Sequence, residues 1–402
     1  MGFLIMLTKT SFKKIYLKIF SLIFLCLFHF QCGGLVTLDI PLEAYQNANA
    51  LWLQPQKNIL RHNSVNSDVF PPYRILWKKK YKSVITDNPL AVDKFLIFTV
   101  QSGMLALIDI EQGKLLGDGH LVPGMLHSAL LHKNILYYSA SLGEETIGAL
   151  DITTLKHIWK KKLPHLNTTP TLWNDILFAG ANNGKFYALD VVSGKILWEF
   201  DTKAPIFGNP SVYQDHVFLT NVKGILFCLD AKNGTKIWKK KLSENIYAGP
   251  LVAEDKIIIG STSGILYAIT VENGTIEWQL NTRGSIYSNA AYREGIIYCG
   301  NNAHKMLALD IYNGKIIWEF QTEGINNSTP LVGPELLYFG SWDKNFYVLN
   351  NKTGELIHKQ EFPRPIKSSP IIYRNRIFIH AANERLYCMT NEQFALKEGQ
   401  KK

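Results

Sequence analysis

The sequence predicts an all-β protein, an eight-bladed β-propeller whose blades are four-stranded antiparallel sheets. Two observations lead to this prediction. Tryptophans recur at a nearly constant spacing, and each interval contains short apolar runs separated by Asn, Asp and Gly turns. The tryptophans are Trp159, Trp198, Trp238, Trp278 and Trp318, at spacings of 39, 40, 40 and 40 residues. A period of about 40 with a fixed aromatic residue is typical of a propeller.

One period, residues 169–204, shows the predicted elements of a blade. Runs rich in Ile, Leu, Phe and Tyr at 170–174, 176–180, 185–190 and 195–200 are predicted strands. The turns between them carry Asn, Asp or Gly, as expected for hairpins. A single sheet of this kind has two apolar faces, so several sheets must pack around a common axis.

The residues that repeat have structural roles. A glycine precedes each fourth strand, where the turn needs a positive φ; these are Gly194, Gly234, Gly274, Gly314 and Gly354. Turn aspartates accept from backbone amides, and we expect this of Asp190, Asp230 and Asp310. A large flat tryptophan suits packing between neighbouring blades. The predicted blade-docking residues are Trp77, Trp159, Trp198, Trp238, Trp278 and Trp318.

The number of blades follows from the register of first strands. Eight units begin near Pro89, Ala129, Pro170, Pro210, Pro250, Ala290, Pro330 and Pro370. The last unit lacks a fourth strand, and an unassigned strand surrounds Trp77 near the start. We therefore predict that this N-terminal strand closes the ring, within a propeller of residues 74–392 followed by a polar tail, 393–402. Seven blades is the alternative if a weak early unit is not a blade.

The segments Ala188–Trp198 and Ala308–Trp318 carry a motif of the form Ala-x-Asp-x-x-x-Gly-Lys-x-x-Trp. This motif resembles the PQQ-like repeat, and the resemblance covers residues 74–390. The motif is degraded at Asp109–Gly117, Asp151–Trp159 and Asn350–His358. The resemblance implies that each tryptophan contacts the next blade.

The N-terminus has the features of an export signal. Four lysines and no acid precede an apolar run of about 12 residues at 19–30, which is the length of a signal core. Cys32 follows directly, before two glycines. This resembles a bacterial lipoprotein signal, although His29, Phe30 and Gln31 depart from the usual small or aliphatic residues. We expect a signal peptide at 1–31, a lipid on Cys32, and a tether and lead-in segment at 32–73. A plain secretory signal or an uncleaved anchor is the alternative.

The charge does not point to nucleic acid. Net charge falls from +10 to +6 once residues 1–31 are removed, because that stretch holds four lysines and no acid. Lysine runs at 78–80, 160–162 and 239–241 follow fourth-strand tryptophans. They fit protection of exposed strand edges, or attraction to an anionic membrane surface. No basic patch is interleaved with stacking aromatics, so nucleic-acid binding is not predicted.

Neither a metal nor a cofactor is predicted. Cys228, Cys299 and Cys388 fall inside separate strands, where cysteine packs as a small apolar residue. The resemblance implies that some relatives are quinone-dependent dehydrogenases, which hold the quinone and calcium at the ring axis and commonly have a vicinal disulfide. This chain has no adjacent cysteines. Asp343, Asn345 and Arg293 are the candidates for such a site, and nothing in the sequence separates them from surface polar residues.

Three loop residues are candidates for contact with a partner: Trp342, Asp343 and His304. A tryptophan in a polar loop without a packing role in the repeat suits partner binding. The alternatives are that Trp342 folds over its own blade and that His304 is simply solvated.

Export, a lipid anchor and a propeller together resemble the BamB-type lipoproteins of outer-membrane assembly. The resemblance implies a non-catalytic interaction scaffold on the periplasmic side of the outer membrane. The implied partners are the periplasmic domains of a barrel-assembly membrane protein and unfolded outer-membrane clients. A periplasmic quinone-dependent dehydrogenase, or a degenerate relative, is the alternative; a small-molecule sensor using the ring axis is a third possibility.

Overall fold

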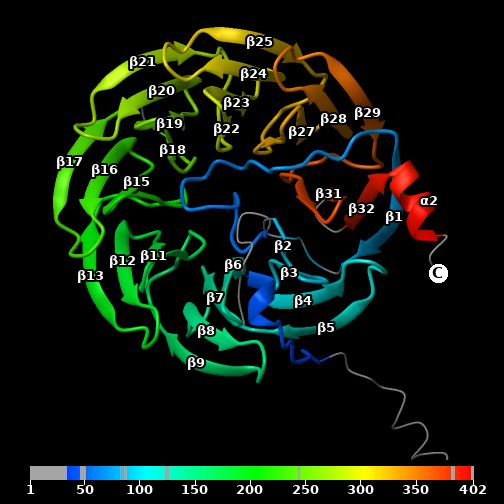
Figure 1. Cartoon of the computed structure of the whole chain (residues 1–402). Coiled ribbons are helices and arrows are strands. Elements are labelled where there is room, and N and C mark those ends of the chain that lie inside the picture. Colours follow the sequence, from blue (N-terminus) through cyan, green and yellow to red (C-terminus); the bar gives the residue numbers. More distant parts are fainter. Residues whose placement is uncertain are drawn as a thin grey trace, which may run out of the picture.

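Eight four-stranded antiparallel sheets are arranged in a ring in the computed structural model (Figure 1). The structure describes residues 34–45, 51–81, 83, 85, 88–122, 126–242, 245–381 and 385–399. The eight-bladed propeller predicted from the sequence is confirmed, and the seven-bladed alternative is wrong. The predicted signal peptide and Cys32 lie outside the described residues.

We number the blades in ring order. The first four, from inner to outer strand, are blade 1, β2 (Leu90–Val92), β3 (Phe95–Thr99), β4 (Met104–Asp109) and β5 (Leu115–His120); blade 2, β6 (Leu126–His132), β7 (Ile135–Ala140), β8 (Ile147–Asp151) and β9 (Lys156–Lys161); blade 3, β10 (Thr171–Trp173), β11 (Ile176–Gly180), β12 (Lys185–Asp190) and β13 (Ile196–Asp201); and blade 4, β14 (Ser211–Tyr213), β15 (His216–Thr220), β16 (Ile225–Asp230) and β17 (Lys236–Lys241).

The other four are blade 5, β18 (Leu251–Ala253), β19 (Lys256–Gly260), β20 (Ile265–Thr270) and β21 (Ile276–Asn281); blade 6, β22 (Ala291–Arg293), β23 (Ile296–Gly300), β24 (Lys305–Asp310) and β25 (Ile316–Gln321); blade 7, β26 (Leu331–Val332), β27 (Leu336–Gly340), β28 (Asn345–Asn350) and β29 (Leu356–Glu361); and blade 8, β30 (Ile371–Tyr373), β31 (Arg376–Ala381), β32 (Arg385–Asn391) and β1 (Tyr73–Lys80).

Burial explains the composition of the strands. The second and third strands are covered by neighbouring blades on both faces, so β12 is buried along its middle four residues. The outer strand β13 instead alternates between half-buried and exposed positions. Continuous apolar runs inside the blade and alternation at its edge are the patterns that these two environments require.

Blade 8 closes the ring with strands from both ends of the chain. β1 pairs antiparallel with β32, from Tyr73 opposite Asn391 to Lys80 opposite Arg385. The predicted strand around Trp77 therefore completes the last blade. After β32 the chain continues into helix α2 (Glu392–Gly399). The sequence prediction described this region only as a polar tail.

The repeated tryptophans lie on the repeated glycines of the next blade. A Cβ on Gly234 would be 2.5 Å from Cε3 of Trp198, and the φ of this glycine is +73°. The Trp198 indole N–H donates to the carbonyl oxygen of Ala231 in the same turn, at 3.2 Å. The same pair of contacts is made by Trp77, Trp159, Trp238, Trp278 and Trp318 with Gly113, Gly194, Gly274, Gly314 and Gly354.

The contact between blades 1 and 2 lacks this tryptophan, because Gly117 stands in its place. Residues 34–40 fill the space. A Cβ on Gly117 would be 2.7 Å from the carbonyl oxygen of Gly34 and 2.9 Å from the amide nitrogen of Val36. The backbone N–H of Leu38 donates to Ile152 O at 2.8 Å, the carbonyl that an indole N–H would otherwise reach.

Candidate interaction surfaces and the ring centre

The centre of the ring is crossed by residues 51–69, which we call the axial segment (Figure 1). In four successive blades an inner-strand amide donates to a carbonyl of this segment at 2.9 to 3.2 Å. The donors are Val212, Val252, Tyr292 and Val332, and the acceptors are Ile59, Leu60, His62 and Asn63.

The axial segment also reaches the other four blades. Trp52 exchanges backbone hydrogen bonds with Ala91 of blade 1, and its indole N–H donates to Ile372 O of blade 8 at 2.8 Å. The Leu131 amide of blade 2 donates to Leu53 O at 2.8 Å. Arg61 donates to Thr171 Oγ1 of blade 3 at 2.6 Å. The segment is therefore bonded to the innermost strand of every blade.

Two basic side chains of the axial segment are withdrawn from solvent. Arg61 is 1% exposed, and its Nε and Nη2 donate to Pro210 O at 3.1 and 2.9 Å. Lys57 places its Nζ 5.4 Å from the centroid of the Trp52 ring. Burial lowers the pKa of Lys57 to about 8, because desolvation disfavours the charged ammonium.

The residues considered for a quinone site do not converge. Arg293 ends β22 at an inner hairpin turn, whereas Asp343 and Asn345 lie at the opposite end of the blade strands, beyond Gly340. The Arg293 Nη1 donates to Val65 O of the axial segment at 2.8 Å, and its Nε lies 3.2 Å from Glu294. These residues therefore do not fit a quinone at the axis.

The two faces of the ring are built from different connections. We call one the linker face; it carries the turns between second and third strands and the linkers between blades, such as 341–344 and 322–330. The other, the hairpin face, carries the remaining turns, such as 214–215 and 231–235. Trp342, Asp343 and His304 all lie on the linker face, in turns of the adjacent blades 6 and 7.

The three predicted contact residues differ in how free their side chains are to contact a partner. Trp342 is 38% exposed, and the ammonium of Lys367, in the next linker, lies 4.1 Å from its ring centroid. The carboxylate of Asp343 is already hydrogen-bonded within the protein, since its Oδ2 accepts from Tyr347 Oη of β28 at 2.7 Å and from the Glu323 amide of the preceding linker at 3.1 Å. His304 adopts φ +63°, and its carbonyl accepts two hydrogen bonds from Thr322.

The linker face also carries exposed aromatic residues that the sequence analysis missed. Phe207, Tyr247 and Tyr287 are 39%, 39% and 44% exposed. Their ring centroids follow one another at 5.5 and 5.9 Å, and we call them the aromatic row. Their spacing of 40 residues is the feature of the sequence that could have identified them as a group. The same register continues to Asn327 and then to Lys367, which covers Trp342.

The linkers that carry the aromatic row are packed backbone to backbone. A Cβ on Gly208 would lie 2.5 Å from Ala248 O, and one on Gly249 would overlap Asn209 O. The Gly249 amide also donates to Asn289 Oδ1 at 3.1 Å. Side chains mounted on such closely packed linkers are held in place before any partner arrives.

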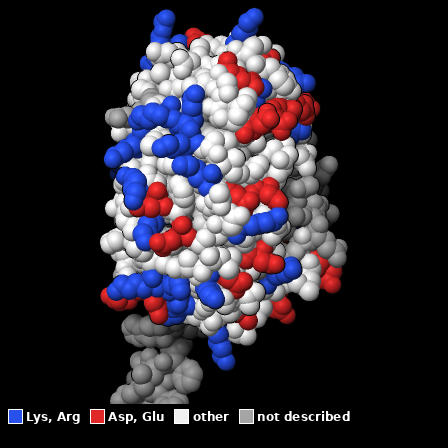
Figure 2. Space-filling view, turned by 90° about the vertical axis from the view of Figure 1, so that its left-hand side faces the viewer, with Lys and Arg blue, Asp and Glu red and all other residues white. Residues whose placement is uncertain are grey.

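Basic side chains border the aromatic row. Lys223 lies in a turn held between two linkers, because the Val222 amide donates to Pro205 O and the Val222 carbonyl accepts from the Asn245 amide. The Lys241 ammonium of β17 donates to the Lys223 carbonyl. Figure 2 views the ring from the side that carries β13, β17 and β21 in Figure 1, and shows Lys and Arg side chains gathered along one margin.

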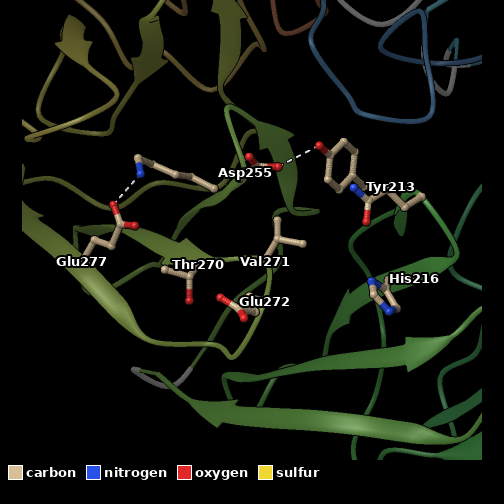
Figure 3. Close-up of a pocket in the computed structure, with 9 residues that line it drawn as sticks. Tyr213, His216, Asp255, Thr270, Val271, Glu272 and Glu277 are labelled. Atoms are coloured by element: carbon tan, nitrogen blue, oxygen red, sulfur yellow. Dashed lines mark hydrogen bonds and ion pairs between the residues drawn. The ribbon is translucent and has the colours of Figure 1, made fainter.

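The hairpin face has a different character. A pocket of about 460 Å³ lies between blades 4 and 5, and carboxylates from Asp255, Glu272 and Glu277 line it (Figure 3). Tyr213 Oη donates to Asp255 Oδ1 at 2.7 Å across the blade boundary, and this bond raises the pKa of Tyr213. The Lys256 ammonium pairs with Glu277 at 2.5 Å.

In the described part of the chain, no group of three or more His, Cys, Asp or Glu side chains is placed to hold a metal ion. None of the helices in those same residues is long and apolar enough to cross a membrane.

Comparisons with known proteins connect the chain to two groups. A family model described as outer membrane protein assembly factor BamB matches residues 143–281 and 213–333. Dehydrogenase subunits of quinone-type alcohol dehydrogenases match shorter stretches: that of Acetobacter aceti is 29% identical over 98 residues, 22% of this chain, and that of Gluconobacter oxydans 34% over 79, 17% of this chain. These matches span only 13% and 10% of the relatives' own lengths.

Solved structures of both groups share the fold. BamB from Moraxella catarrhalis superposes with a TM-score of 0.67 at 15% identity, covering 79% of this chain and 100% of that one. Quinohemoprotein alcohol dehydrogenase from Comamonas testosteroni gives 0.72 at 11% identity, covering 86% and 81%. With these matches, the 40-residue motif and the eight closed blades, the chain is a PQQ-like repeat β-propeller.

Proposed function

We propose that this chain is a non-catalytic protein-interaction scaffold on the periplasmic side of the outer membrane, anchored by a lipid on Cys32, and that it assists β-barrel assembly. Its partners would be the periplasmic domains of a barrel-assembly membrane protein, with unfolded outer-membrane clients as further ligands. The match of residues 143–333 to the BamB model supports this proposal.

The observation that carries the proposal is the occupation of the ring axis. In the quinone enzymes that the repeat resembles, the axis is where the cofactor binds. Here the axial segment crosses that position and is hydrogen-bonded to the inner strands of all eight blades. At the same time, aromatic side chains are presented to solvent on the linker face. An occupied axis and an exposed aromatic surface favour binding of a macromolecule over chemistry at the centre.

The experiment is an in-cell crosslink followed by a pull-down in mild detergent, with the full-length chain and with Cys32→Ser. We expect the barrel-assembly subunit to be recovered with the full-length chain and to be reduced or lost with Cys32→Ser. Membrane attachment without any assembly subunit would rule out the assembly role.

A quinone-dependent dehydrogenase is the second candidate, and the two alcohol dehydrogenase matches favour it. Titration of the full-length chain with pyrroloquinoline quinone and Ca²⁺ tests it directly. Saturable, calcium-dependent quinone binding would support this candidate. No binding at concentrations that saturate a known quinone enzyme would exclude it.

A further inference from the structure

We propose that the linker face of blades 4 to 6 binds an extended acidic polypeptide segment that carries aromatic or aliphatic side chains. The inference rests on the proposed scaffold role and names the surface and the chemistry of the partner. The apolar part of this surface is the aromatic row, and its charged part is the basic border, which is formed by Lys223 and Arg283.

The aromatic row provides the apolar contact. Phe207, Tyr247 and Tyr287 leave a large fraction of their rings in water, although each has a neighbouring ring within 6 Å. Exposed tyrosine and phenylalanine are typical anchor residues of protein interfaces. Because the linkers beneath them are packed backbone to backbone, little conformational entropy remains to be lost when a partner binds.

The geometry of the row suits a single extended chain. Successive centroids lie 5.5 and 5.9 Å apart. Side chains on one face of a β-strand recur about every 6.6 Å, twice the rise per residue. Alternate side chains of an extended segment can therefore follow the row ring by ring.

The charge around the row selects an acidic segment. The nearby carboxylates of blades 3 and 6 are already paired: Asp201 with Lys203 at 2.6 Å, and Glu319 with Lys305 at 2.9 Å. Within the described residues, no ion pair involves Lys223 or Arg283. Positive charge beside an apolar row attracts acidic partners and speeds their association.

The hairpin face, on the opposite side of the ring, would disfavour the same acidic segment. In the pocket between blades 4 and 5 on the hairpin face, Glu277 is paired with Lys256, and the carboxylates of Asp255 and Glu272 remain to face an incoming segment. An acidic segment would meet like charge there, which is unfavourable. Figure 2 shows one large group of Lys and Arg side chains on this side of the ring, with Asp and Glu side chains interspersed below it and over the rest of the view.

The test uses a fluorescein-labelled nonapeptide of alternating Phe and Asp, with a Phe and Lys peptide as its charge-inverted partner. Fluorescence anisotropy with the full-length chain should show binding of the acidic peptide only. The triple variant Phe207→Ala, Tyr247→Ala, Tyr287→Ala should weaken binding at least tenfold. Tyr312→Ala, an exposed aromatic in a hairpin-face turn, is the matched control and should leave binding unchanged.

Charge is tested separately. Lys223→Glu with Arg283→Glu should weaken binding of the acidic peptide at least fivefold and remove the salt dependence of that binding. Lys315→Glu with Lys352→Glu, on the hairpin face, should have no effect. Equal losses in both pairs, or equal binding of the two peptides, would contradict the inference. So would binding of phosphatidylglycerol vesicles, but not of the peptide, through the aromatic row.

The inference and the proposed function fail in distinguishable ways. Recovery of the barrel-assembly subunit by the triple variant as well as by the unaltered chain would keep the scaffold role and remove the aromatic row from it. Peptide binding that needs the row, without recovery of any assembly subunit in cells, would keep the surface and remove the assembly role.

Discussion

At the scale of single residues, the ring is held together by pairs of tryptophan and glycine. The indole fills the space that a Cβ would occupy, and the glycine adopts a backbone conformation that other residues avoid. The two residues are therefore needed together. At the boundary between blades 1 and 2, where Gly117 replaces the tryptophan, the partner turn also lacks its glycine and carries Leu155 at φ +56°.

We expect Gly234→Ala to be strongly destabilising. The positive φ costs about 1–2 kcal/mol in any L-residue, and the overlap with Trp198 adds ~1–3 kcal/mol of overpacking. Gly295→Ala is the matched control, because Gly295 has φ +81° but its nearest neighbour, Tyr312, would be 3.5 Å from the new Cβ. Urea unfolding of both variants separates the two costs, and equal losses would mean that the tryptophan contact contributes little.

Lys57 should make stability depend on pH in the alkaline range. Its pKa is about 8 in the folded chain and 10.5 in the unfolded reference, so the unfolded chain binds more protons between these values. Stability gained from deprotonating Lys57 should therefore appear as pH rises from 8 towards 10.5. Thermal unfolding of the unaltered chain and Lys57→Met should show a difference that narrows over this range, whereas Lys352→Met should show no such trend.

At the scale of elements, the boundary between blades 1 and 2 depends on a segment outside the repeat. Residues 34–40 supply the backbone donor and the apolar contacts that a tryptophan supplies elsewhere. Asn134 in the hairpin turn of blade 2 holds the same segment by donating to Ile40 O at 3.0 Å and accepting from Tyr45 Oη at 2.8 Å. The N-terminal segment is therefore part of the propeller core.

Gly117→Val should displace residues 34–36, because its Cβ would meet their backbone atoms. We expect a lower thermal midpoint and faster proteolysis within residues 34–45. Gly34→Ala is the control, since a Cβ there has no heavy atom within 4 Å. If both variants are cleaved at the same rate, the segment does not close this boundary.

The sequence predicted the blades well because each repeat carries its own register. Prolines, turn glycines and tryptophans recur every 40 residues, so eight sheets and their closure by the Trp77 strand could be read without tertiary information. The sequence predicted a lead-in segment within residues 32–73, on a family resemblance of Trp52–Asn63, but its hydrogen bonds to all eight blades, the filling of the Gly117 gap and helix α2 could not be predicted. Their contacts join residues far apart in the chain, such as Trp52 and Ile372, and no period marks them.

The candidate surface was only partly predictable for a related reason. Trp342 stood out because its neighbours in the repeat are small or polar. The aromatic row repeats in register, so its members resembled structural residues until their exposure was known. Asp343 was chosen for its type, but its carboxylate already accepts from the Tyr347 hydroxyl and the Asn345 amide of β28.

At the scale of the whole molecule, the axial segment links all eight blades at the centre while tryptophans link neighbours at the rim. Arg61 lies in the middle of this arrangement, bonded to the strand starts of blades 3 and 4. A buried guanidinium of this kind leaves several acceptors without partners when it is removed.

We expect Arg61→Met to loosen the inner strands of several blades together. Hydrogen exchange at the amides of Val212, Val252, Tyr292 and Val332 should accelerate at least tenfold, because all four donate to the axial segment. Amides of the outer strand β17 should change little. Arg283→Met, at an exposed arginine, is the control; acceleration confined to blades 3 and 4 would show that the axial segment does not couple the ring.

The spacing of contacts along the axial segment matches the number of blades in the ring. The segment's backbone hydrogen bonds meet the blades in chain order, with Trp52 on blade 1, Leu53 on blade 2, Ile59 on blade 4, Leu60 on blade 5, His62 on blade 6 and Asn63 on blade 7. Nearly every repeat therefore has its own hydrogen-bonding residue in the axial segment. If one 40-residue repeat were excised, the ring would have a smaller circumference, and the bonding residues of the axial segment would no longer line up with the remaining blades. Gain or loss of blades in such a protein therefore requires a matching change in a short segment far away in the gene.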